Sequence, residues 1–388
     1  GILMIIEIIT TGDEVLTGFT VDTNASWLSL QLLEQGWQVR RRQTVGDRMD
    51  DLTNLLQERS LVADVIIFNG GLGPTSDDKT TDAVAQVAGV PQELNTDWLA
   101  NMEQKFSNRG RAMPISNRKQ AMLPQGATVL DNPIGTACGF KLKINKAWCY
   151  FTPGVPNEFK QMVQQQIIPD LQRHYPTGAA IVRRYFTFGI SESSLSDQLD
   201  TLSWPEHIEL GYRSSMPIIE MKLISQQPDA DFDTAEKQLL SVITPYLVAS
   251  GQLDMPNTLA GLLQGPLEIL EGGTYGQLLS DLAPAIPQLC GDYHTHLPDS
   301  ADELLQHIQH HSRLTLAIGS ATEQHYPIAL WDGLHGRAQT LYVRTLDVTL
   351  QRRIISFAAQ DMLRRYLLKL PALGEYQTLQ RTDSSYRP

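Results

Sequence analysis

A glycine-rich loop with two adjacent acids is the part of this 388-residue chain whose residue types most clearly suggest chemistry. Residues 70–78 read Gly-Gly-Leu-Gly-Pro-Thr-Ser-Asp-Asp. The backbone N–H groups of such a turn, helped by a threonine hydroxyl, can hold a phosphate. The two carboxylates would repel that phosphate unless a divalent cation lay between them. The loop therefore predicts a phosphate and metal site, and a turn whose acids complement a helix dipole is the alternative.

The elements around the loop explain how further acids would reach it. Strand-like runs at 4–10, 39–44 and 63–68 alternate with helical patterns at 24–34 and 50–59. Such alternation predicts a parallel sheet with right-handed crossovers. The carboxyl ends of its strands then meet at one edge, where a cation is needed to hold five acids together. These acids are Asp13, Glu14, Asp47, Asp77 and Asp78.

Each acid has a predicted role, although the sequence leaves open which one is the base and which are ligands. The predicted metal ligands are Asp13, Asp47 and Asp78. The predicted catalytic residues are Asp47, Asp77, Asp78 and Glu14. For Asp47, a solvated turn position stays open as the alternative. The predicted substrate or phosphate contacts are Gly70, Gly71, Gly73, Thr75, Asn24, Lys119, Gly135 and Thr136.

Composition limits the classes of function. The formal charge of −12 and the isoelectric point near 5.2 disfavour non-specific nucleic-acid binding, which needs a surplus of Lys and Arg. Three scattered cysteines indicate a reducing compartment. No apolar run approaches the ~20 residues of a membrane span. We therefore expect a cytoplasmic protein with a small-molecule nucleotide substrate and without nucleic-acid or membrane partners.

A series of motifs along the amino-terminal part of the chain resembles the amino-terminal domain of the CinA family of competence-damage-inducible proteins. The motifs are Thr11-Gly12-Asp13-Glu14, Asp22-Thr23-Asn24, Val45-Gly46-Asp47, 70–78, 117–121, 132–140 and 153–159. The resemblance implies a molybdopterin-binding-like α/β domain at 1–174, a small KH-like α+β domain at 175–252 and an α/β deamidase-like domain at 256–372. The polar tail from residue 377 is expected to be frayed.

The resemblance also implies a function for the first domain. Some family members hydrolyse ADP-ribose with a divalent metal, giving AMP and ribose 5-phosphate. By this resemblance we expect Mg, Mn or Co, an optional monovalent cation and a homodimer. The alternatives are a nucleotide or pterin sensor that binds without cleaving, and a molybdenum-cofactor enzyme. The last is disfavoured because cofactor proteins usually carry a shorter Gly-Gly-Thr or Gly-Gly-Val run than residues 70–78.

The carboxy-terminal domain of the family is commonly a nicotinamide mononucleotide deamidase with a serine nucleophile in the run Glu-Ser-Cys-Thr-Gly-Gly. The corresponding stretch here reads Glu271-Gly272-Gly273-Thr274-Tyr275-Gly276. Gly272 takes the place of the serine and has no hydroxyl to activate. Thr274 has no evident partner that would make it a substitute. The sequence therefore predicts a degenerate domain without deamidase activity.

Overall fold

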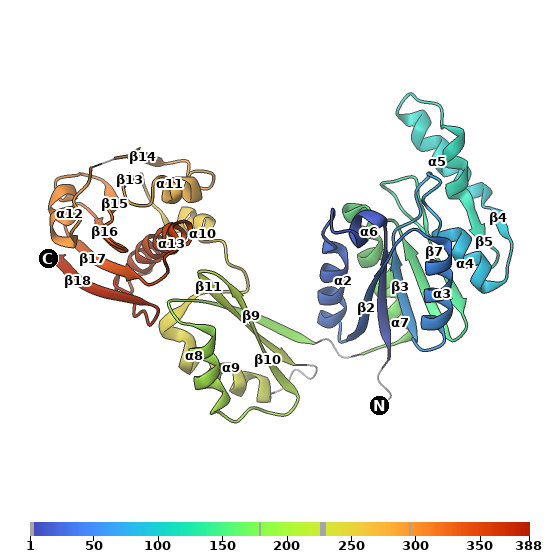
Figure 1. Cartoon of the computed structure of the whole chain (residues 1–388), viewed down its shortest axis with the longest axis horizontal. Helices are drawn as coiled ribbons and strands as arrows, with labels where there is room; N and C mark the ends of the chain where they lie inside the picture. The colour runs from blue at the N-terminus through green and yellow to red at the C-terminus, as the bar shows by residue number, and fades with distance from the viewer. Residues whose placement is uncertain (1–3, 178–179, 226–229, 295) are drawn as a thin grey trace. The chain divides into compact units, whose positions relative to one another are not determined.

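The computed structural model describes residues 4–177, 180–225, 230–294 and 296–388. Backbone contacts divide the chain into two compact units, Gly1–Ala180 and Ile181–Pro388 (Figure 1). Each unit has its own sheets and its own buried cores. Among the described residues, no helix is both long enough and apolar enough to cross a lipid bilayer.

The first unit is built on a six-stranded sheet in the order β2-β1-β3-β8-β7-β6. Its strands are β1 (Ile6–Thr11), β2 (Val39–Val45), β3 (Val65–Asn69), β6 (Thr128–Leu130), β7 (Gly139–Ile144) and β8 (Ala147–Thr152). Strands β1, β2, β3 and β8 are parallel, β7 runs antiparallel to β8, and β6 runs antiparallel to β7. The carboxyl ends of four strands therefore share one edge.

Helices cover both faces of this sheet. The helical elements of this unit are α1 (Asp13–Leu16), α2 (Thr23–Glu34), α3 (Met49–Ser60), α4 (Thr80–Ala88), α5 (Thr96–Asn108), the 3-10 helix η1 (Ile115–Ala121), α6 (Pro156–Met162), the π-helical turn η2 (Val163–Ile167) and α7 (Ile168–His174). A separate pair of strands is formed by β4 (Gln92–Leu94) and β5 (Met122–Pro124). Ile66 and Phe68 of β3 enter one core, whereas Val65 and Ile67 enter the other. Because side chains alternate across a strand, β3 is buried on both faces.

The predicted α/β class is confirmed by this arrangement. Helix α2 begins one residue before the predicted start and ends at the predicted residue, and α3 extends one residue beyond the predicted helix at each end. The parallel order of β1, β2 and β3 is the one that the alternating pattern predicts. The strand pattern is clear in β1 and β3 because every residue of these two strands is buried.

The second unit contains two sheets. One is an antiparallel sheet with the strand order β10-β11-β9-β12. Its strands are β9 (Ile181–Phe188), β10 (Ile208–Ser215), β11 (Ile218–Ser225) and β12 (Leu247–Ser250). The helices in this part of the chain are α8 (Glu192–Asp200), α9 (Ala230–Ile243) and the 3-10 helix η3 (Thr244–Tyr246). The other sheet has the order β14-β13-β15-β16-β17-β18. Its elements are α10 (Met255–Leu262), β13 (Leu267–Glu271), α11 (Gln277–Leu282), β14 (Leu289–Tyr293), α12 (Ala301–Ile308), β15 (Leu314–Ile318), β16 (His325–Trp331), β17 (Gly336–Val343), α13 (Val348–Leu367) and β18 (Leu379–Arg387).

The boundary expected between residues 252 and 256 lies inside this second unit. Phe188 and Ile218 of the four-stranded sheet share one core with Leu259 and Ile355. The rings of Phe188 and Phe357 lie 4.8 Å apart. Because a single core spans both sheets, the two parts expected as separate domains form one compact unit.

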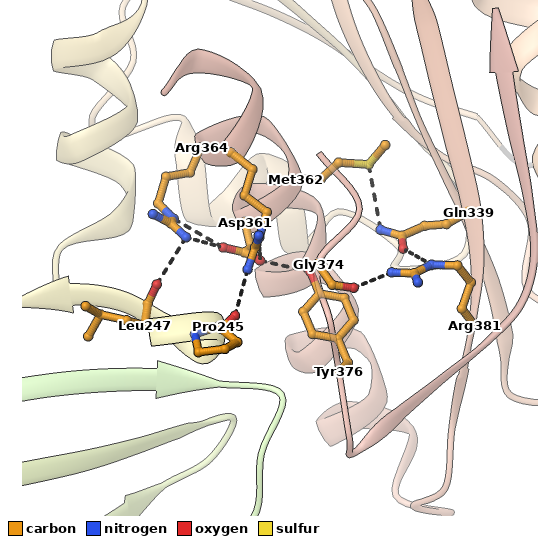
Figure 2. Close-up of polar contacts among 10 residues, drawn as sticks. Pro245, Leu247, Gln339, Asp361, Met362, Arg364, Gly374, Tyr376 and Arg381 are labelled. Atoms are coloured by element: carbon orange, nitrogen blue, oxygen red, sulfur yellow. Dashed lines mark hydrogen bonds and ion pairs between the residues drawn. The ribbon is translucent and has the colours of Figure 1, made fainter. Parts of the chain in front are cut away.

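A buried ionic cluster also ties the two sheets together (Figure 2). Asp361 of α13 is 1% exposed and accepts hydrogen bonds from Arg364 Nη2 and Arg365 Nε, both at 3.0 Å. Arg364 Nη2 also donates to the carbonyl of Leu247 at 3.3 Å, and Arg365 Nη2 donates to that of Pro245 at 3.0 Å. The carboxylate thus holds two guanidinium groups against the backbone that leads into β12.

The carboxy-terminal segment differs from the frayed tail expected from its polarity. Strand β18 pairs antiparallel with β17 at the edge of the six-stranded sheet. Arg381 Nε donates to Gln339 Oε1 at 3.0 Å, and Arg387 forms an ion pair with Asp302 at 2.7 Å. Most side chains of β18 are exposed, because an edge strand can keep one face in solvent. The prediction of a frayed tail is therefore wrong.

Candidate active site

A cavity of about 900 Å³ lies at the carboxyl edge of the first sheet. Segments that follow β1, β2, β3 and β8 line it. The predicted site residues found in the lining are Glu14, Asn24, Asp47, Gly70, Gly71, Gly73, Thr75, Asp77, Asp78, Gly135 and Thr136. Asp13 and Lys119 lie outside that lining. The sheet therefore brings together most of the residues that the strand pattern predicted for one edge.

The glycine loop needs its first two glycines to fold. Gly70 and Gly71 have φ angles of 108° and 72°, which side-chain-bearing residues rarely adopt. A Cβ at Gly70 would stand 2.7 Å from the carbonyl oxygen of Thr11, and one at Gly71 would stand 2.0 Å from Thr80 Oγ1. The N–H of Gly70 donates to the carbonyl of Thr152 at 2.8 Å, so this group is not available to a phosphate. Gly70 thus shapes the loop and does not supply the N–H that we predicted for it.

Asp78 and Lys119 hold the far end of the loop. The N–H of Thr75 and its hydroxyl both donate to Asp78 Oδ2, at 3.0 and 2.7 Å. Lys119 Nζ donates to the carbonyl of Thr75 at 2.5 Å and to that of Asp78. In this arrangement the ammonium braces the loop from outside the cavity, and it does not face the site predicted for phosphate.

The acids nearest to Asp47 affect its proton affinity. Burial raises the pKa of Asp47, and the carboxylates of Asp13, Glu14 and Asp77 raise it further. The N–H of Asp13, which donates to Asp47 Oδ2 at 3.3 Å, opposes that rise. In return, the N–H of Asp47 donates to Asp13 Oδ1 at 3.0 Å. Asp13 is therefore engaged with the backbone, while Asp47 is a carboxylate whose charge the site disfavours.

Negative charge dominates the cavity wall. Arg109 is the one basic side chain in the lining among the described residues. The carboxylates in the lining are Glu14, Asp22, Asp47, Asp77, Asp78 and Glu158. The described residues contain no group of three or more acids, histidines or cysteines placed to hold a metal ion. The carboxylates of the lining still suit Mg²⁺, because Mg²⁺ commonly binds only one or two carboxylates and completes its coordination shell with water and substrate phosphates.

The raised pKa of Asp47 leads to a stability prediction. A carboxyl whose pKa is raised in the folded state destabilises that state at pH values where it is ionised. We expect Asp47→Asn to raise the Tm at pH 7 without divalent cation, and the gain to shrink as the pH falls toward the ordinary pKa of 3.8. Thermal unfolding against pH measures this, with exposed Asp51→Asn as the control. A lower Tm for Asp47→Asn at pH 7 would contradict it.

Asn69 and Glu158 are among the lining residues that sequence reasoning did not name as site residues. Asn69 ends β3, and Glu158 lies in the first turn of α6, where its Oε1 accepts from Asn132 Nδ2 at 2.7 Å. A signal for both exists in the sequence. Asn69 directly precedes the glycine loop, and Glu158 follows a Pro-Gly-Val-Pro turn that has the same strand-turn-helix form.

Comparison with known proteins identifies the family. A family model described as a probable molybdopterin binding domain matches residues 7–173. A CinA-like protein of Shewanella halifaxensis is 46% identical over 285 residues, which cover 72% of this chain and 67% of that protein. The chain belongs to the CinA-like family. A second CinA-like protein, from Shewanella woodyi, is 51% identical over 224 residues, which cover 58% of this chain and 53% of that protein.

A solved structure of the protein CinA from Thermoplasma acidophilum, described as of unknown function, is 32% identical to the chain. The match covers 43% of this chain and 98% of the solved chain, with a TM-score of 0.40. The chain spans about two thirds of the first CinA-like relative and about half of the second. What the whole relatives do is therefore carried to this chain only as a proposal.

In this CinA-like protein the turn after β13 is closed around Glu271. The buried carboxylate accepts from the N–H groups of Leu278 and Leu279, both at 2.9 Å, and from the hydroxyl of Thr274. Thr274 is itself 1% exposed. A Cβ at Gly272 would stand 3.3 Å from the carbonyl oxygen of Ile318. The turn is thus tightly packed, and its acid is occupied by three donors.

This packing predicts that restoring the serine will not restore deamidation. Gly272→Ser is expected to release no more ammonia from nicotinamide mononucleotide than the wild type, which should release none, because Glu271 is already bonded to three donors. A small fall in Tm is expected from the close Cβ contacts. An ammonia assay of both proteins measures the first effect, and ammonia release by either one would contradict the prediction.

Proposed function

We propose that the first unit hydrolyses a nucleotide pyrophosphate with the help of a divalent cation. The best candidate reaction converts ADP-ribose and water to AMP and ribose 5-phosphate. The observation that carries this proposal is the cavity at the carboxyl edge of the sheet, where the glycine loop and six carboxylates line one space. An acidic wall of this kind accepts a pyrophosphate when cations neutralise it.

The chain's own residues have distinct parts in the proposed reaction. Asp47 acts as the base, because its raised pKa makes it a better proton acceptor than an ordinary aspartate. It takes the proton of the attacking water as the new P–O bond forms and the bond from that phosphorus to the bridging oxygen breaks. The N–H groups of Gly71 and Gly73, which have no protein acceptor among the described residues, donate to phosphate oxygens.

The cation would be held by Asp77 and Glu14, whose carboxylates lie close enough to raise the pKa of Asp47, so that Asp47 stays free to accept a proton. When bound, such a cation neutralises phosphate charge and acidifies water. Asp13 and Asp78, predicted as ligands from the sequence, each have one oxygen occupied by backbone N–H donors. Mg, Mn or Co, with an optional monovalent cation, belongs to the same proposal, as do a homodimer and a cytoplasmic location.

A second candidate is a sensor that holds a nucleotide or a pterin without cleaving it. The description of the matching family model as a probable molybdopterin binding domain favours this alternative. In that case the acids would bind cation and ligand, and no water would be activated. In this alternative the second unit would serve assembly.

One experiment separates the two candidates. The protein is mixed with ADP-ribose, nucleoside diphosphate sugars or a pterin, each with Mg²⁺, Mn²⁺ or Co²⁺, and both the heat of binding and the products are recorded. AMP from ADP-ribose supports the enzyme. Tight binding without products supports the sensor, and neither binding nor products would remove both candidates.

A further inference from the structure

The side chain of Asn24 forms part of the cavity wall near the glycine loop. Asn24 lies in the first turn of α2, lines the cavity and is 6% exposed. Its Nδ2 donates to the carbonyl of Gly154 at 3.0 Å and to Asn69 Oδ1 at 3.2 Å. Both amide hydrogens are therefore used. Its Oδ1 is buried and has no hydrogen-bond partner.

The orientation of this amide is fixed by backbone carbonyls, which can only accept. Asn69 Nδ2 donates to the carbonyl of Pro153 at 2.7 Å and to Thr152 Oγ1 at 3.1 Å, so Asn69 Oδ1 must face Asn24. The hydroxyl of Thr152 is committed in turn to the carbonyl of Phe68 at 3.0 Å. Turning the Asn24 amide over would set its oxygen against the carbonyl of Gly154. The donors and acceptors of this network can therefore be assigned in only one way, and this assignment leaves Asn24 Oδ1 without a donor.

Of the substrate or phosphate contact predicted for Asn24 from the sequence, this unpartnered oxygen favours the substrate contact. Phosphate oxygens of a pyrophosphate accept hydrogen bonds, and the Asn24 side-chain atom that has no partner, Oδ1, is also an acceptor. A buried acceptor without a donor is unfavourable, which makes a ligand O–H or N–H the fitting partner. Asn24 and Gly154 line the same cavity as the glycine loop, and a Cβ at Gly154 would stand 3.7 Å from the Cα of Gly70.

We propose that Asn24 Oδ1 accepts a hydrogen bond from a sugar hydroxyl of the bound nucleotide, which makes Asn24 a specificity residue for ribose. The inference rests on the proposed function, since it takes a nucleotide pyrophosphate as the ligand. In such a ligand, ribose is the group bonded directly to the phosphates that the loop would hold. Each ribose hydroxyl can donate to the amide oxygen, which deoxyribose at the same position cannot do.

The test compares ADP-ribose with analogues in which a single ribose hydroxyl is replaced by hydrogen. Kd by calorimetry and kcat/KM for AMP formation are measured with Mg²⁺ for the wild type, Asn24→Ala and Thr152→Val. We expect the wild type to discriminate against at least one analogue by about tenfold or more, because a site built around a hydroxyl rejects its absence. Asn24→Ala should treat that analogue and ADP-ribose alike, whereas Thr152→Val should still discriminate.

Thr152→Val is the matched control because it disturbs the same network while leaving the Asn24 oxygen in place, and Thr152 does not line the cavity. Equal preference for all analogues in the wild type would overturn the inference. So would an Asn24→Ala protein that weakens every ligand by the same factor and keeps the discrimination. Binding without AMP would remove the proposed reaction alone, because the ratio of Kd values still reports on Asn24.

Discussion

Asp47→Asn is expected to lower the kcat for AMP formation from ADP-ribose by at least about a hundredfold, the usual loss when a general base is removed. The substitution keeps the size of the side chain and an oxygen that can accept from the N–H of Asp13. It removes the carboxylate that would take the proton of water. The measurement is initial-rate kinetics at saturating Mg²⁺ or Mn²⁺.

The control for this result is Asp51→Asn, which changes an exposed aspartate of α3 outside the cavity lining. Its kcat should stay within about twofold of the wild type, since surface changes of this kind have small effects. Misfolding would not explain an inactive Asp47→Asn protein whose Tm at pH 7 is raised. An Asp47→Asn protein that keeps more than a tenth of the activity would show that another acid is the base.

Asp361→Asn should have the largest effect on stability, about 3–5 kcal/mol of the free energy of unfolding, because it leaves buried guanidinium groups without their counter-charge. Arg364 and Arg365 both bond to this carboxylate, and the hydroxyl of Tyr376 donates to it at 2.9 Å (Figure 2). The amide of asparagine cannot accept from all of these donors and carries no charge. Unfolding in urea, followed by fluorescence, measures the loss.

The matched control is Asp383→Asn, an exposed aspartate of β18 in the same unit. Its free energy of unfolding should change by no more than about 0.5 kcal/mol. If the urea midpoints of Asp361→Asn and the wild type coincide, the cluster does not stabilise the second unit. Arg364 and Arg365 would then be held by the carbonyls of Leu247 and Pro245 alone.

The strands of the first unit could be predicted because their residues carry a strong periodic signal. β1 and β3 are fully buried, and β3 appears in the sequence as an apolar run from Val65 to Phe68, whereas Glu7 interrupts the apolar residues of β1. Their parallel order follows from the helices between them. This order brings Glu14, Asp47 and Asp77 to one edge, as the sequence predicts.

The hydrogen bonds of the site could not be predicted, since they join residues far apart in the chain. Asn24 and Gly154 are 130 positions apart, and Asn69 and Pro153 are 84 apart. They meet because β3 pairs with β8, a neighbour relation that periodicity does not specify. For this reason the sequence names Asn24 as a substrate or phosphate contact but does not indicate which of its side-chain atoms is left without a partner.

The second unit shows a different limit. The exposed, polar side chains of β18 resemble those of a tail, although the backbone pairs with β17 along the strand. Similarly, the linker-like residues before α10 suggest a domain boundary, but Phe188 packs on Phe357 across it. The polarity of a segment indicates only whether its side chains contact solvent. The pairing of β18 depends on backbone hydrogen bonds, and the joined core depends on packing between distant segments, so polarity predicts neither.

The most direct test of the proposed hydrolysis is product analysis of the whole chain with ADP-ribose. The expected result is equal amounts of AMP and ribose 5-phosphate in the presence of Mg²⁺, Mn²⁺ or Co²⁺, no products with a chelator, and initial rates at least about a hundredfold lower with Asp47→Asn. Unchanged ADP-ribose after prolonged incubation with each of these metals would contradict the assignment of an enzyme to this cavity.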